Sequence, residues 1–192
     1  MFCRSKYSIR RCVDIRVAGK YIFLGGTSSG KSLVAERTIS SFGPEIRYLA
    51  TAPAKWGEND LEFASRIAKH KERRDHRWQL IELTEPRGLY ALISKAVVPT
   101  LIDSVGVWLA ADPTFEPDLD LLEHSIIQAA VPLVFVSEEA GLGLLPIDRV
   151  SRSYLDRLGA VNQRISRSVD RSFLVVAGQL LELSSPEFGA AR

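Results

Sequence analysis

Short runs of consecutive apolar residues alternate along this chain with stretches in which apolar residues recur every three or four positions. The first pattern is typical of strands that are buried on both faces of a sheet, and the second is typical of amphipathic helices. The apolar runs predict strands over residues 20–24, 46–51, 77–83, 97–103, 132–137 and 172–178, with 180–183 as a final edge strand. The helical patterns predict helices over residues 31–42, from residue 84 onward, over 119–130 and over 147–169.

Glycine, proline and capping residues set the expected ends of these elements. Gly43 and Pro44 stop the first helix, and Pro99 either weakens the fourth strand or places its start later. A further helix is expected from Asn59 through Arg74, because asparagine is a suitable N-cap and Glu62 stands three residues after it.

The alternation of strands and helices predicts an α/β fold with a mostly parallel central sheet, helices on both faces and a possible antiparallel edge strand. We expect one domain over residues 20–185, a poorly ordered basic extension over 1–19 and a tail over 186–192. Ligands in such sheets bind beyond the carboxyl ends of the strands. The loops that follow Leu24, Thr51, Asp103 and Ser137 are therefore where a site is expected.

Composition and charge narrow the possible partners. The net charge of +2 is uneven, because residues 1–20 carry six basic residues and one acidic residue, and the remainder carries 19 basic and 22 acidic residues. A slightly acidic body predicts no nucleic-acid partner, and no apolar run approaches the roughly 20 residues needed to span a membrane. The basic head has some transit-peptide character but fits an extended start equally well. Its two cysteines, Cys3 and Cys12, are expected to be free thiols in a reducing cytoplasm.

The sequence "GGTSSGKS" matches the phosphate-binding pattern G-x-x-x-x-G-K-[ST] in full and lies between a predicted strand and a predicted helix. Such a P-loop wraps its backbone N–H groups around phosphates at a helix N-terminus. We expect Lys31 to reach the β- and γ-phosphates and Ser32 to bind Mg²⁺. The candidate nucleotide contacts here are Gly25, Gly26, Thr27, Ser28, Ser29, Gly30, Lys31 and Ser32.

Asp103 ends an apolar run, which is the position of a second metal anchor in P-loop proteins. Glu138 and Glu139 follow another strand and are weaker candidates for that role. These features predict a P-loop NTPase-like nucleotide-binding protein. They do not by themselves choose among a kinase, a GTPase switch and an ATPase, although a small P-loop chain without a guanine-reading motif is typical of metabolite kinases.

His70 lies in a strongly basic segment, with Arg66, Lys69, Lys71, Arg73 and Arg74 around it. Nearby cations oppose protonation of an imidazole, so His70 is expected to stay neutral and nucleophilic where an anionic substrate would be attracted. A solvated basic helix with a chance histidine explains the spacing equally well.

Beyond these single motifs, the chain resembles the bifunctional adenosylcobinamide kinase / adenosylcobinamide-phosphate guanylyltransferase family of cobalamin biosynthesis. The resemblance runs from Tyr21 to Leu183 and is carried by "GGTSSGKS", "YLAT", "DLEFASRIAKHKERR", "LIDSVGVWL" and "VFVSEEAGLGLLPIDR". It implies two reactions at one nucleotide-binding region, using GTP, ATP and Mg²⁺. A nucleoside triphosphate phosphorylates adenosylcobinamide, and a histidine then carries GMP from GTP to the resulting phosphate.

The resemblance also implies the residues of the site. His70 matches the nucleophilic histidine, and Lys31 joins it as a catalytic residue. Further nucleotide contacts are implied at Ala50, Thr51, Ala52, Lys71, Glu72, Arg73, Arg74, Glu82 and Asp103, with Ser32 and Asp103 at the metal. The partners implied are a corrinoid substrate and further copies of the chain, as a trimer.

Four positions depart from the family pattern. Ser28 stands where an arginine is frequent, Gly106 and Ala111 replace a threonine and an asparagine, and Glu138 replaces a common asparagine. The main rival function is a P-loop kinase for another small alcohol, in which His70 is incidental. A second rival, which Gly106 and Ala111 favour, is a nucleotide-binding regulatory protein that has lost catalysis. A structural protein with a vestigial loop is the third.

Overall fold

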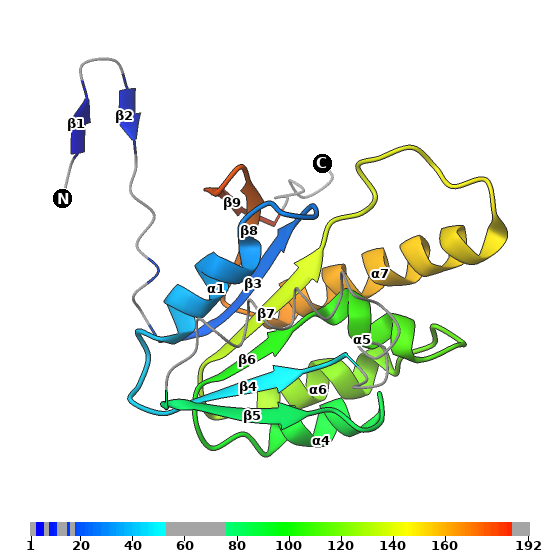
Figure 1. Ribbon diagram of the computed structural model, residues 1–192, viewed down its shortest axis with the longest axis horizontal. Helices are drawn as coiled ribbons and strands as arrows, with labels where there is room; N and C mark the ends of the chain where they lie inside the picture. Colours follow the sequence, from blue (N-terminus) through cyan, green and yellow to red (C-terminus); the bar gives the residue numbers. More distant parts are fainter. Residues whose placement is uncertain (1–2, 6–7, 11–14, 16–17, 53–75, 186–192) are drawn as a thin grey trace, which may run out of the picture.

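A computed structural model describes residues 3–5, 8–10, 15, 18–52 and 76–185 of the chain. Its body is a seven-stranded sheet in the order β5-β4-β6-β7-β3-β8-β9 (Figure 1). Adjacent strands run parallel except β8 and β9, which pair antiparallel at one edge. This confirms the expected sheet and its antiparallel edge strand. The strands are β3 (Lys20–Gly25), β4 (Ile46–Ala50), β5 (Trp78–Glu82), β6 (Thr100–Asp103), β7 (Leu133–Glu138), β8 (Arg171–Val176) and β9 (Gln179–Leu183).

Helices cover both faces of this sheet, as the pattern predicted. The described helices are α1 (Lys31–Ile39), α4 (Gly88–Ser94), α5 (Val105–Ala111), α6 (Leu119–Gln128) and α7 (Arg149–Ser168). A separate two-stranded antiparallel sheet joins β1 (Cys3–Ser5) to β2 (Ser8–Arg10) in the basic head. None of the described helices is both long enough and apolar enough to cross a membrane.

The side-chain alternation of the strands divides the core into two layers. In β3, Ile22 and Leu24 join a cluster with buried residues of α4, α5, α6 and α7, whereas Tyr21 and Phe23 join a second cluster with Ala35 and other α1 residues. Successive side chains of a strand point to opposite faces, so this split follows directly from the period of two. The α1 face is therefore distinct from the face that carries the other four helices.

Most elements differ from their predicted bounds by one to three residues, and two of these differences have a local cause. Helix α1 ends at Ile39, because Ser41 N and Phe42 N donate to carbonyls three residues earlier and tighten the last turn. Strand β6 begins at Thr100, directly after Pro99, which has no N–H for a ladder. Helix α4 begins at Gly88 rather than at residue 84, and α5 was not predicted from the sequence patterns.

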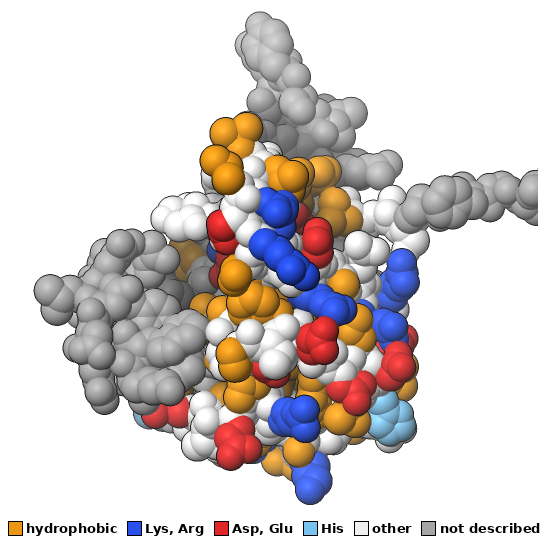
Figure 2. All heavy atoms as spheres, turned by 90° about the vertical axis from the view of Figure 1, so that its right-hand side faces the viewer, with side chains coloured by type: hydrophobic (Ala, Val, Ile, Leu, Met, Phe, Trp, Pro, Cys, Tyr) orange, Lys and Arg blue, Asp and Glu red, His pale blue; other side chains and the backbone are white. Residues whose placement is uncertain are grey.

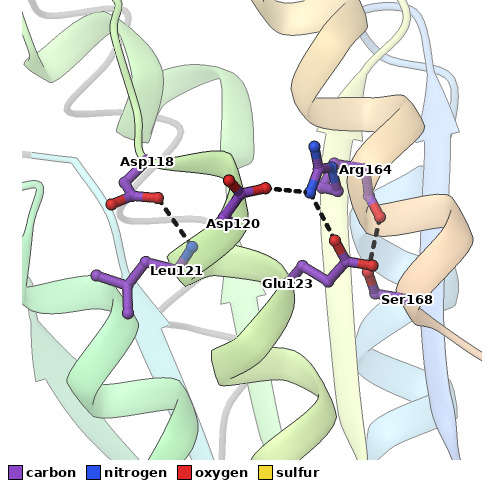
Figure 3. A network of polar contacts seen from close by, with 6 residues as sticks. All are labelled: Asp118, Asp120, Leu121, Glu123, Arg164 and Ser168. Atoms are coloured by element: carbon purple, nitrogen blue, oxygen red, sulfur yellow. Dashed lines mark hydrogen bonds and ion pairs between the residues drawn. The ribbon is translucent and has the colours of Figure 1, made fainter.

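Helices α6 and α7 are joined by a polar cluster on their exposed sides (Figure 3). The Arg164 guanidinium of α7 donates to the carboxylates of Asp120, at 2.7 Å, and Glu123, at 2.6 Å, both on α6. Asp118 caps α6 by accepting from Leu121 N at 2.9 Å. The two Arg164 contacts join α7 to α6.

Candidate nucleotide-binding site

The P-loop leaves the carboxyl end of β3 and enters α1, where the sequence placed it. Ser29 N donates to Gly26 O at 3.3 Å, and Val34 N donates to Gly30 O at 3.1 Å as the helix begins. Gly30 caps α1 with a left-handed backbone, φ 95°, and Ser28 has φ 58°. The loop therefore turns sharply and presents the N-terminal end of α1, which favours anions, at the carboxyl edge of the sheet.

Close packing explains two glycines of this loop. A Cβ at Gly25 would lie 2.5 Å from Val175 O and 2.7 Å from Ser29 Oγ, so no larger residue fits there. At Gly30 a Cβ would lie 3.3 Å from Gly178 Cα, and Gly178 N donates to Ser29 O at 2.8 Å. The turn between β8 and β9 thus supports the P-loop from behind. A Cβ at Gly26, in contrast, would meet nothing within 4 Å, so the loop is open on that side.

Lys31 is already directed across the loop. Its side chain is largely buried, with the residue 8% exposed, and Nζ donates to Gly26 O at 3.1 Å. Ser29 Oγ is buried and has no hydrogen-bond partner among the described residues. A buried hydroxyl without a partner marks a place where a ligand oxygen would complete the bonding. Both features fit a phosphate-binding loop that has a bound oxyanion as its missing partner.

Asp103 closes β6 on the same face of the sheet as α1. The preceding residues alternate, with Leu101 in the α1-side cluster and Ile102 in the opposite one. Tyr48, also in the α1-side cluster, donates its hydroxyl to Asp103 Oδ2 at 2.7 Å. One strand, β7, separates β6 from β3. Two strand spacings make the gap about 10 Å, which leaves room for phosphates and a metal ion between Asp103 and the P-loop.

These residues fit the requirements of Mg²⁺. This ion is usually bound by one or two carboxylates together with substrate phosphates and water rather than by a cage of protein ligands. No group of three His, Cys, Asp or Glu side chains that could hold a metal occurs among the residues that the structure describes. Asp103 offers a carboxylate at the end of β6 and Ser32 offers a hydroxyl on the first turn of α1, and oxygen ligands of both types suit this ion.

The carboxyl end of β4 is tied to the neighbouring β6. Thr51 N donates to Asp103 O at 3.2 Å, and Thr51 Oγ1 donates to Ser104 O at 2.7 Å while accepting from Ser104 N at 2.8 Å. Thr51 is buried, so its side chain serves the strand junction, whereas Ala50 and Ala52 are partly exposed beside it.

The remaining predicted residues fall into two groups. Glu82 ends β5 and is exposed, four strand spacings from β3, which is about 19 Å, so the structure does not bring it to the P-loop. His70, Lys71, Glu72, Arg73 and Arg74 lie outside the described residues. The predicted helix that begins at Asn59 lies outside them as well.

Sequence reasoning gave little weight to Glu138, which is the centre of a polar cluster at the carboxyl end of β7. Its carboxylate accepts from Ser104 Oγ, 2.8 Å to each oxygen, and from Gly106 N at 3.1 Å. Tyr154 of α7 donates to Gly106 O at 3.2 Å. Burial, and then the charge of Glu138, raise the pKa of Tyr154 to about 12. The signal in the sequence was the acidic residue at the end of an apolar strand, but its partners lie 32 and 34 residues away.

The loop between β7 and α7 is unusually apolar for an exposed segment. Leu142, Leu144, Leu145 and Ile147 are 74–98% exposed, and the loop begins beside the P-loop because Glu139 N donates to Gly25 O at 3.1 Å. Figure 2 views the side on which this loop and the start of α7 lie in Figure 1, and hydrophobic side chains gather over its upper part. The segment that starts beside the P-loop therefore carries exposed apolar side chains along its length.

A parallel sheet with a glycine-rich loop, a buried lysine and an acidic strand end defines a P-loop nucleotide-binding protein of the α/β class. The chain belongs to the CobU family, described as cobinamide kinase / cobinamide phosphate guanyltransferase, whose profile matches residues 21–183. This match confirms the resemblance found in the sequence, with the same limits.

Curated relatives agree with this assignment. The chain is 34% identical over 166 residues to the bifunctional adenosylcobalamin biosynthesis protein CobP of Pseudomonas aeruginosa, covering 82% of this chain and 92% of that protein. It is 29% identical over 176 residues to the bifunctional adenosylcobalamin biosynthesis protein CobU of Salmonella typhimurium, covering 80% and 93%. Among solved structures, the flagellar accessory protein FlaH of Methanocaldococcus jannaschii superimposes with a TM-score of 0.47 at 17% identity, covering 84% and 74% of the two chains.

Proposed function

We propose that this protein phosphorylates adenosylcobinamide with ATP or GTP and then transfers GMP from GTP to adenosylcobinamide phosphate. The observation that carries the proposal is the intact P-loop, with Lys31 buried across it and Asp103 facing the same side, in a chain of the cobinamide kinase / guanyltransferase family. The family membership supplies the corrinoid substrate and the two reactions. The geometry supplies a phosphate cradle in which both nucleotides would bind.

In the kinase step, the substrate hydroxyl oxygen attacks the γ-phosphorus, the bond to the β–γ bridging oxygen breaks, and the hydroxyl proton is lost to solvent. Lys31 would exchange its bond to Gly26 O for phosphate oxygens and so offset the charge that develops on the leaving diphosphate. Ser32 and Asp103 would hold Mg²⁺, which supplies charge neutralisation at the phosphates. The α1 N-terminus favours the same anions.

In the transferase step, we propose that the His70 imidazole attacks the α-phosphorus of GTP and pyrophosphate leaves, so that GMP is held through a nitrogen–phosphorus bond. A phosphate oxygen of the corrinoid then attacks the same phosphorus, the nitrogen–phosphorus bond breaks and the histidine is regenerated. The product is adenosyl-GDP-cobinamide. The support for this step is the family resemblance and the basic residues Lys71, Arg73 and Arg74 beside His70 in the sequence.

The loop after β7 favours this acceptor over a small hydrophilic alcohol. Residues 140–147 carry no charge, and four large apolar side chains of this segment, which begins beside the P-loop, are exposed. A corrinoid offers a large body with an apolar rim, which such a surface would contact favourably. We also propose a cytoplasmic location and a homo-oligomer, a trimer by family resemblance.

The decisive experiment uses GTP labelled at the α-phosphate. After incubation and denaturation, the wild-type protein is expected to retain the label and release it in acid, as a phosphoramidate does. His70→Ala should abolish the label without loss of nucleotide binding, whereas the matched variants His76→Ala and His124→Ala, both at exposed positions, should keep it. Nucleotide binding without label in the wild-type protein would contradict the covalent step and favour a regulatory role.

A further inference from the structure

The carboxylate of Glu138 is bonded to the turn that follows Asp103. Ser104 Oγ donates to both carboxylate oxygens at 2.8 Å, and Gly106 N donates to Oε2 at 3.1 Å. The same Ser104 Oγ accepts from Val107 N at 3.4 Å and so begins α5. Glu138, at the end of β7, therefore holds this strand to the start of α5, the helix that follows the neighbouring strand β6. Because both oxygens already accept hydrogen bonds within the protein, the carboxylate is occupied as a structural acceptor.

The turn held by Glu138 is also held from its other side. Thr51 Oγ1 bonds both the N–H and the carbonyl of Ser104, at 2.8 and 2.7 Å, and Thr51 N donates to Asp103 O at 3.2 Å. A continuous chain of bonds thus crosses the carboxyl ends of β7, β6 and β4. Asp103 is part of this chain through its backbone, while its carboxylate is oriented separately by the hydroxyl of Tyr48 at 2.7 Å.

Helix α7 fixes Glu138 itself. Asn162 Nδ2 donates to the Glu138 carbonyl at 3.0 Å, and Asn162 Oδ1 accepts from the buried Ser137 hydroxyl at 2.6 Å. Asn162 is 5% exposed, so these bonds lie inside the protein. The backbone from which the Glu138 side chain projects is consequently held by a buried residue of α7.

From this geometry we propose that Glu138 is a positioning residue for the metal–nucleotide site, acting on Asp103 through Ser104. The inference deepens the proposed function, since it concerns how the same site holds Mg²⁺. Ser104 directly follows Asp103, the last residue of β6. The bond from Ser104 to Glu138 therefore restrains the position of the Asp103 backbone. Residues that orient a metal ligand from behind typically change metal affinity when they are lost. Removal of the carboxylate charge should act on the metal rather than on the phosphate cradle, because the hydrogen-bond partners of the carboxylate, Ser104 and Gly106, lie outside the P-loop.

The test is the affinity for a fluorescent ATP analogue, measured for purified full-length protein with EDTA and across a Mg²⁺ titration. For Glu138→Gln, we expect the Mg²⁺ concentration at half-effect to rise roughly tenfold, the size typical of partners that orient metal ligands. The affinity in EDTA is expected to change less than about twofold, because the P-loop is untouched. Ser104→Ala should reproduce the shift, and Ser104→Thr, which keeps a hydroxyl, should restore most of the wild-type behaviour.

Two further variants sharpen the result. The double variant E138Q/S104A should shift the Mg²⁺ requirement no more than S104A alone, because S104A removes the hydroxyl whose bond E138Q weakens. Glu116→Gln, at an exposed ion pair with Arg157, is the matched control and should leave the Mg²⁺ requirement unchanged. If E138Q fails to fold, S104A against S104T tests the same bond.

The proposal is overturned if E138Q and S104A lower the melting temperature and leave the Mg²⁺ requirement unchanged. The bond between Ser104 and Glu138 would then contribute to stability alone. Equal weakening with and without Mg²⁺ would also overturn it, by placing the effect on the P-loop. Since the readout is nucleotide binding, it remains valid if the protein proves inactive on corrinoids, an outcome that would refute the proposed function alone.

Discussion

The carboxylate of Glu138 occupies the space that a side chain at Gly106 would need. A Cβ at Gly106 would lie 2.3 Å from Glu138 Oε2 and 2.8 Å from Tyr154 Oη. The sequence resemblance singled out both positions as departures from the family pattern, and the structure shows that they are neighbours. The absence of a side chain at residue 106 is what lets Glu138 reach the backbone of α5.

We therefore expect Gly106→Ala to destabilise the protein, although alanine is the better helix former. The new methyl group would displace a carboxylate held by three hydrogen-bond contacts, and overpacking of this kind costs about 1–3 kcal/mol. The measurement is urea unfolding. In a background with the shorter Glu138→Asn, the added cost of G106A should shrink, and a full, additive loss in the double variant would contradict the steric coupling.

Replacing the P-loop lysine should weaken both nucleotides together. Lys31→Ala removes the buried ammonium that bonds Gly26 O, and loss of a charge-assisted bond to phosphate of about 1.5–3 kcal/mol corresponds to roughly a 10- to 150-fold loss of affinity. ATP and GTP affinities are measured separately by equilibrium titration. Lys95→Ala, at an exposed position after α4, is the control. Unchanged GTP affinity in K31A would require a second nucleotide site.

The start of α7 predicts a loss of stability in acid. Asp148 caps this helix by accepting from Ser151 N at 2.8 Å, and the hydrogen bonds from Ser151 lower the pKa of Asp148 below its ordinary value of 3.8. A lowered pKa in the folded state means that the stabilisation is full above pH 3.8 and is lost as the pH falls through the folded-state pKa. The stability advantage of wild type over Asp148→Ala should shrink below pH 3.8. An advantage independent of pH would contradict a charged cap.

The pKa of Tyr154 is raised rather than lowered, so this residue predicts a loss of stability in alkali. Burial, followed by the charge of Glu138, raises its pKa to about 12, so its share of stability is full below pH 10 and is lost between pH 10 and about 12. Absorbance titration of wild type against Tyr154→Phe isolates this tyrosine among the five in the chain. In the Glu138→Gln background, the absorbance difference between proteins with and without the Tyr154 hydroxyl should titrate at lower pH, because the charge of Glu138 no longer raises the pKa. A midpoint at 10 in the wild-type protein would disprove the burial of this hydroxyl.

Much of the fold is readable from the sequence because its signals are local. The strand of Lys20–Gly25 is a continuous apolar run, and the loop that follows needs glycine at positions 25 and 30 for reasons of close packing and positive φ. Pro99 correctly indicated a later start for β6. The antiparallel edge formed by β9 was also expected.

Features that depend on distant neighbours were not readable in the same way. Helix α5 carries Gly106 and two β-branched valines, which lower helix propensity, so its N-cap at Ser104 was the sole local signal. The contacts of Glu138 depend on the sheet order, which places β7 between β3 and β6. The hydrophobic periodicity of the sequence does not indicate the spatial order of the strands in the sheet. The distance of Glu82 from the P-loop follows from the same order.

The bond from Lys31 to Gly26 O has a consequence for the free energy with which the protein binds its ligand. Because the ammonium is buried and already oriented, an incoming triphosphate exchanges with an internal acceptor instead of immobilising a freely rotating side chain. Little conformational entropy is then lost on association, since a lysine that is restrained beforehand has few rotamers left to give up. The P-loop is in this sense a preorganised receptor, and nucleotide exchange between the two reactions needs no rebuilding of the lysine side of the loop.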